Sequence, residues 1–140
     1  MSRVMDDAAL WERFSASLLT HAEWTHEAHV RTAFLFASRF PIDEAHLRMR
    51  AGIIRLNERH GLVETPARGY FETLTRGWVV LVADARRRSN ALTSHALLEA
   101  CPELMDRGLL LKHYSRELLA TARARAIFIP PDVAPLPDVD

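Results

Sequence analysis

The chain has 140 residues, a length typical of one domain that can bury a core without disulfide bonds. Its 18 basic and 18 acidic residues cancel, so the overall charge favours neither nucleic acid nor an anionic membrane as a partner. Cys101 is the only cysteine, which excludes an intrachain disulfide, and residues 1–10 lack the apolar stretch of a signal peptide. No uncharged apolar run approaches the roughly 18 residues of a membrane span. We therefore expect a cytoplasmic protein.

Apolar residues recur at intervals of three and four in the first part of the chain, which is the helical period. This pattern predicts four main helices, over residues 7–19, 26–40, 42–60 and 66–88. Thr20 or Thr25 is expected to cap the second helix, and Gly61 to end the third in a left-handed conformation. Thr65 before Pro66 is a typical helix start and is expected to begin the fourth. The inward positions of the third helix are predicted at Leu47, Ile53, Ile54 and Leu56.

The elements after Asn90 are shorter. Short helices are predicted over residues 93–100, from Pro102 to a break at Gly108, and over 116–119 behind a Ser115 cap. Residues 129–140 contain four prolines and no helical period, so an extended tail is expected, laid over the bundle by Ile127, Phe128 and Val133. No strand alternation is found. The sequence predicts an all-α protein: one helical bundle domain, residues 1–129, and a proline-rich tail, residues 130–140.

Two histidines stand three residues apart at the start of the second predicted helix, in the stretch WTHEAHVRTAFLF of residues 24–36. His26 and His29 both lie at the edge of the face that we expect to be buried, where an imidazole needs a hydrogen-bonding partner. Two neutral imidazoles on a bundle-facing helix can bind a divalent metal, provided that another helix supplies the remaining ligands.

The fourth predicted helix offers such a ligand in RGYFETLTRGW, residues 68–78. Glu72 lies in a segment with few exposed positions, and Tyr70, Thr73 and Thr75 place three hydroxyls near it. A carboxylate in such surroundings either pairs with a cation or has its pKa raised, and both are useful for acid–base catalysis.

We therefore predict one site between the second and fourth helices. Its catalytic residues would be His26, His29, Tyr70 and Glu72. A divalent metal, if bound, would be held by His26, His29 and Glu72. The substrate-binding residues would be Trp24, Phe34, Asn57, Phe71, Thr75 and Trp78. His60 could extend this polar cluster together with Asn57.

Structural roles for the same residues stay open. The paired histidines could be hydrogen-bonded residues of the core edge, and His60 a cation at a helix C-terminus. Glu72 could form a buried ion pair with one of five arginines: Arg31, Arg50, Arg55, Arg68 or Arg76. ARRRS, residues 85–89, is best interpreted as a solvated helix end, because positive charge is favourable there. Cys101 is interpreted as an inert core thiol.

Four segments carry a resemblance to a known family: WTHEAH (24–29), GYFETLT (69–75), HYSREL (113–118) and ARAIFIPPDVAPLP (124–137). Over nearly its whole length the chain resembles a family of small, uncharacterised bacterial proteins with these motifs in this order. The resemblance implies a shared role for the histidine pair, Tyr70 and Glu72, and draws attention to His113, Tyr114 and Arg116. Relatives often have histidine or asparagine where this chain has Phe71, so a metal ligand supplied there would be missing. The resemblance implies no established reaction.

Two functions of different classes are compatible with these patterns. The first is an enzyme that performs acid–base chemistry, with or without a metal, on a small organic molecule in a condensation, isomerisation or hydrolysis. The second is a non-catalytic binding or interaction module in which the His/Glu cluster is a structural polar network. The sequence leaves open whether two copies pair through Trp11, Phe14 or the tail.

Overall fold

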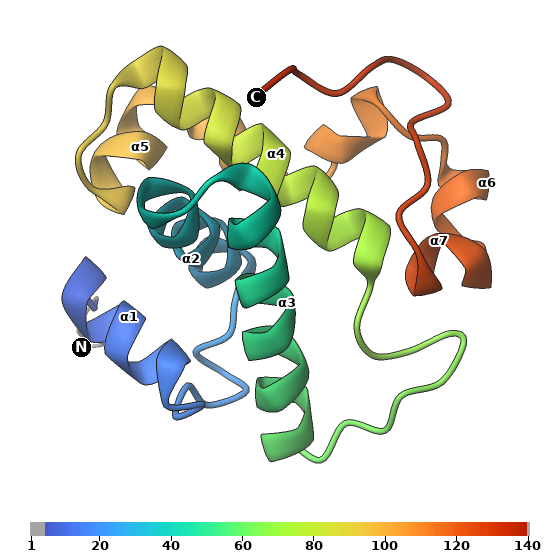
Figure 1. The fold of residues 1–140 in the computed structure, drawn as a ribbon, viewed down its shortest axis with the longest axis horizontal. Helices are drawn as coiled ribbons and strands as arrows, with labels where there is room; N and C mark the ends of the chain where they lie inside the picture. Colours follow the sequence, from blue (N-terminus) through green and yellow to red (C-terminus); the bar gives the residue numbers. More distant parts are fainter. Residues whose placement is uncertain (1–4, 140) are drawn as a thin grey trace.

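The computed structural model describes residues 5–139, which form helices joined by short loops. The elements in chain order are α1 (Asp7–Ser15), α2 (His26–Arg39), α3 (Ile42–Arg59), α4 (Glu72–Ser89), α5 (Ser94–Ala100), the 3-10 turns η1 (Pro102–Met105) and η2 (Leu109–Lys112), α6 (Arg116–Leu119) and α7 (Ala122–Ala126). No strand occurs within the described range, so the predicted all-α fold is confirmed. In Figure 1, α1, α2 and α5 lie to one side of α3, while α6, α7 and the tail lie on the other side, along α4.

The core forms where the apolar faces of α2, α3 and α4 meet. Val30 and Ala33 of α2 and Val79 and Val82 of α4 are fully buried. In α3 the buried row is Ala45, Met49, Ile53 and Leu56, and the predicted inward Leu47 is 57% exposed. The phase predicted for this helix was therefore wrong at its start, because the buried row there runs through Met49 and not through Leu47. None of the helices in the described part of the chain is long and apolar enough to cross a membrane.

The predicted caps Thr25 and Ser115 both begin their helices. Thr25 accepts a hydrogen bond from Ala28 N at 3.1 Å and so caps α2. Gly61 takes the expected left-handed conformation after α3, with φ +73°. The first helix ends earlier than predicted, at Ser15, because Ser17 turns left-handed with φ 56° and breaks the helical hydrogen-bonding pattern.

The start of α4 corrects a second prediction, because Thr65 and Pro66 belong to a loop. Thr65 and Arg68 exchange backbone hydrogen bonds of 2.9 and 3.2 Å in a tight turn. The carboxylate of Glu64 then accepts the backbone N–H of Tyr70 at 3.0 Å, and Gly69 has φ +110°, outside the range of a helix. Tyr70 and Phe71 therefore precede α4, and Glu72 is its first residue.

The C-terminal tail is held mainly through its backbone. Tyr114, whose burial raises its pKa to about 12, donates its hydroxyl to Ile129 O at 2.7 Å. Val133 N donates to His113 O at 2.9 Å, and Asp132 accepts the Ser115 hydroxyl at 2.6 Å. His113, Tyr114 and Ser115 thus form hydrogen bonds with the tail, through the backbone carbonyl of His113 and the hydroxyls of the other two.

Two details of the C-terminal region differ from the prediction. Ile127, Phe128 and Val133, expected to cover the bundle, are 46%, 40% and 58% exposed. Instead, Thr73 on α4 accepts from Ile129 N and donates to Ile127 O, at 3.1 and 2.8 Å. The short helix α7 was not predicted. Its segment of alternating alanine and arginine has no apolar period, and its one buried residue is Ala124.

Candidate functional site

A cavity of about 290 Å³ lies beside the first turn of α2 and the first two turns of α4. We call it the histidine pocket. Its lining residues are Trp24, Thr25, His26, His29, Leu74, Trp78 and Arg107. Thr25 caps α2 and thereby fixes the turn from which both imidazoles project.

The His26 imidazole is held in one orientation. Its Nε2 lies 2.8 Å from Leu104 O, and since a carbonyl can only accept, Nε2 carries the proton. The other ring nitrogen, Nδ1, then has a lone pair while the ring is neutral. The indole of Trp78 meets the ring edge to face, at 4.7 Å between centroids and 72° between planes.

The His29 imidazole has no hydrogen bond or ion pair with any described residue. Within residues 5–139 its one ring neighbour is Trp24, at 5.6 Å between centroids. Burial, together with the charge that His26 would carry, lowers the pKa of His29 to about 4. At neutral pH the ring is therefore uncharged, with one N–H donor and one acceptor available to a molecule in the pocket.

Glu72 lies in a different cluster, which we call the glutamate network, formed with His46, Arg50 and Tyr70. The hydroxyl of Tyr70 and Nε2 of His46 both donate to Glu72 Oε1, at 2.7 and 2.9 Å. Arg50 Nη1 donates to Oε2 at 3.1 Å. The Glu72 side chain is only 12% exposed, and its place at the N-terminus of α4 also favours negative charge.

The titrating neighbours in the glutamate network are held in their neutral forms. Burial first, and then the hydrogen bond to Glu72, raises the pKa of Tyr70, while Thr75 acts in the opposite direction. Burial lowers the pKa of His46, against the opposing effect of Glu72. His46 Nδ1 has no hydrogen-bond partner in the described structure, and His46 and Glu72 border a separate cavity of about 380 Å³ beneath residues 136–139.

The structure thus divides the predicted site into two. Trp24, His26, His29 and Trp78 share the histidine pocket, while Tyr70 and Glu72 belong to the glutamate network and Thr75 interacts with Tyr70 beside it. The predicted metal ligands His26, His29 and Glu72 are not brought together, and residues 5–139 contain no group of three His, Cys, Asp or Glu side chains that could hold a metal ion. Glu72 is two residues before Leu74, which lines the histidine pocket, so it lies on the opposite side of α4 and bonds to α3.

Four of the predicted substrate-binding or cluster residues lie outside both sites. Phe34 is 2% exposed in the core, and the ring of Phe71 packs under the guanidinium of Arg125 at 4.4 Å. Asn57 is half-buried on α3 and borders neither cavity. His60 does not extend the cluster, because its Nε2 bonds to Leu19 O at 2.8 Å. Among the five arginines considered for Glu72, Arg50 is the one bonded to it.

His46 and Arg107 are site residues that the sequence prediction missed. His46 precedes the buried Met49 by three residues, so a helix phase through Met49 would have placed it inward. Arg107 lies between two 3-10 turns, where no periodic pattern signals its position. Comparison of the chain with protein families, curated proteins and solved structures gave no match.

Proposed function

We propose that the protein is an enzyme that binds a small organic molecule in the histidine pocket and moves a proton with its two imidazoles. The observation that carries this proposal is His29: a neutral imidazole, without a partner among the described residues, lining a cavity. His29 is half-buried, so its ring nitrogens are open to the pocket and can form hydrogen bonds with a ligand there. The cavity is close to the lower end of the range of small-molecule sites.

The lining of the pocket indicates the chemical class of the substrate. Trp24 and Trp78 provide flat apolar surfaces that suit a planar or aromatic group. Arg107 is exposed and has no acidic partner in the described part of the chain, so it can bind a carboxylate at the rim. We therefore propose an aromatic carboxylate that also carries a carbonyl group.

The two histidines suit different steps. A pKa near 4 makes His29 a weak base but a neutral hydrogen-bond donor, which can polarise a carbonyl without carrying charge. His26 holds its Nε2 proton against Leu104 O, so its lone-pair nitrogen Nδ1 is the proton acceptor. Together they support removal of a proton beside the polarised carbonyl, as in an isomerisation. Two imidazoles are fewer than the three protein ligands of catalytic zinc sites, so we include no metal in this proposal.

For the glutamate network we propose the alternative, structural function. Both carboxylate oxygens of Glu72 accept donors, from Tyr70, His46 and Arg50. These three bonds connect α3, the loop before α4 and the first turn of α4. We propose that they fix the relative positions of these segments.

Phenylpyruvate tests the enzymatic proposal because it combines an aromatic ring, a carboxylate and a carbonyl. We expect the protein to accelerate deuterium exchange at the carbon beside the keto group, measured by NMR in D₂O, and its tryptophan fluorescence to change on binding. His29→Gln should reduce the exchange rate at least tenfold. The matched control is His95→Gln, a half-buried histidine on α5 outside the pocket. Equal exchange rates in wild type and His29→Gln would refute the proposal.

A further inference from the structure

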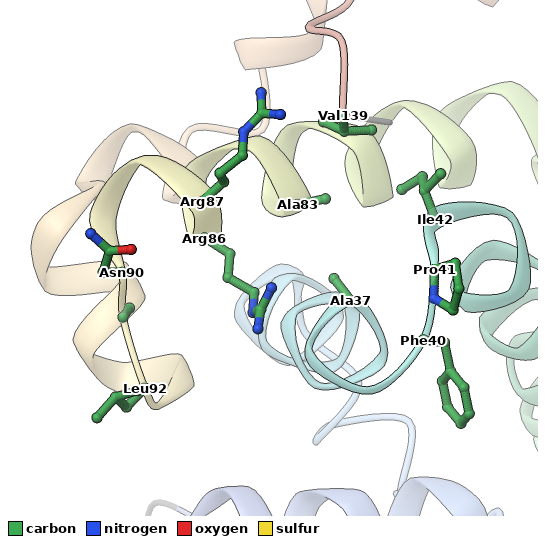
Figure 2. A pocket seen from close by; sticks show the side chains of 11 residues that line it. Ala37, Phe40, Pro41, Ile42, Ala83, Arg86, Arg87, Asn90, Leu92 and Val139 are labelled. Carbon is green, nitrogen blue, oxygen red and sulfur yellow. The ribbon is translucent and has the colours of Figure 1, made fainter.

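A larger cavity, of about 500 Å³, lies on the other side of α4's C-terminal half. Figure 2 shows it between α4 and the end of α2, with the α2–α3 connection on one side and the chain after α4 on the other. We call it the arginine pocket. Its walls include Ala37, Phe40, Ile42, Ala83, Arg86 and Val139.

Arg86 supplies the unbalanced charge of this pocket. Its half-buried guanidinium reaches from α4 toward the end of α2 (Figure 2), and no described residue forms an ion pair or side-chain hydrogen bond with it. The nearby Asp84 is already bonded by Arg87 at 3.4 Å and Arg88 at 2.8 Å. Arg87 also lines the cavity, but its guanidinium is already bonded, to Asp84 and to Asp138 O at 2.7 Å.

The helix dipole alone does not explain why Arg86 lies in the cavity without an acidic partner. Positive charge at the C-terminus of α4 is favourable for Arg86, Arg87 and Arg88 alike. Arg86 and Arg87 both line the cavity, which has no acidic residue in its lining, but of these two only Arg86 has no bonded side-chain partner among the described residues. A guanidinium is always charged, so a half-buried one beside apolar surface is stabilised by a counter-charge.

We infer that the arginine pocket binds an amphipathic organic anion, with its acidic head on Arg86 and its hydrocarbon part against Phe40, Ile42 and Val139. A guanidinium presents two parallel N–H donors, which match the oxygens of a carboxylate or a phosphate. The apolar side chains on either side of it match a short alkyl chain, and the volume is within the usual range for a small ligand. This site is separate from the histidine pocket.

Isothermal titration calorimetry with octanoate, octyl phosphate and 1-octanol tests this inference, because the three share a chain and differ in the head. We expect at least one anion to bind in the submillimolar range and octanol at least tenfold more weakly. Carboxylate and phosphate heads are distinguished by which anion binds more tightly. Arg86→Gln should weaken anion binding at least tenfold, whereas Arg88→Gln, which removes an exposed charge outside the pocket, should leave it unchanged.

Ala83→Leu locates the site independently of charge, because Ala83 projects into the cavity (Figure 2) and a larger side chain there would fill it. We expect this variant to lose binding, and His29→Gln to retain it. The inference is overturned if neither anion binds, if octanol binds as tightly as the anions, or if Arg86→Gln or Ala83→Leu binds like wild type.

Discussion

Replacing Glu72 by glutamine tests directly whether the glutamate network is structural. The substitution keeps the size of the side chain and one acceptor oxygen, but it removes the negative charge that Tyr70, His46 and Arg50 share. The new amide nitrogen would face Arg50 Nη1, which lies 3.1 Å from Oε2, and two donors cannot bond to each other.

The size of the effect follows from the burial of each partner. Hydrogen bonds to charged groups contribute about 1.5–3 kcal/mol each, and neutral ones about half as much. The bonds from Tyr70 and His46 are largely buried and become neutral, at a cost of about 1 kcal/mol each. The Arg50 side chain is 46% exposed and can turn to solvent, so its loss adds under about 1 kcal/mol. We expect Glu72→Gln to lower the free energy of unfolding by about 2–3 kcal/mol.

Urea unfolding at pH 7, followed by circular dichroism, measures this change. With the usual dependence on urea, the midpoint should fall by about 1 M. Asp43→Asn is the matched control, because Asp43 also pairs with an arginine of α4, at 2.9 Å, but is 84% exposed. We expect it to change stability by less than about 0.5 kcal/mol. A Glu72→Gln effect as small as that of Asp43→Asn would refute the structural role.

Three further predictions concern pH, packing and the tail. Because the pKa of His29 is about 4 when folded and near its ordinary 6.5 when unfolded, the unfolded chain binds more protons between these values. Stability should therefore fall by about 3 kcal/mol as pH falls from 6.5 to 4, and His29→Gln should flatten this dependence in urea titrations at several pH values. Gly52→Ala should destabilise by about 1–3 kcal/mol in thermal unfolding, since a Cβ there would lie 2.3 Å from Phe14 Cε2; an unchanged melting temperature would contradict the packing of α1 on α3. Tyr114→Phe should cost about 1 kcal/mol in urea unfolding and speed proteolysis of the tail, because it strands the carbonyl of Ile129; equal cleavage rates would contradict that anchor.

Local signals in the sequence predicted the helices well, except where two signals compete. Thr65 followed by Pro66 satisfies the rules for a helix start, yet a Glu64 carboxylate that bonds to Tyr70 N and a left-handed Gly69 keep the chain in a loop. The carboxylate bond joins residues six positions apart, and neither it nor the glycine conformation follows from periodicity. The start of α4 therefore depends on interactions that a helical pattern does not describe.

In the candidate site, too, the sequence predicted local groupings and missed contacts between distant residues. His26 and His29 were correctly placed together, because positions three apart share one helix face. Trp78 could be expected near them only if α4 packs on α2, which its apolar face suggested. Arg50 was among the candidate partners of Glu72, but His46 was not predicted, since it lies 26 positions earlier in sequence and its burial follows from the phase of α3 against α4.

The anchoring of the tail also bears on the order in which the chain can fold during synthesis. Thr73, in the first turn of α4, bonds to Ile127 and Ile129, which are translated 54 and 56 residues later. A nascent chain that already contains α1 to α4 can pack the apolar faces of these helices together, because all the residues in those contacts have been made. It cannot complete the hydrogen bonds of Thr73, at the N-terminal end of α4, until residues 127–129 have left the ribosome.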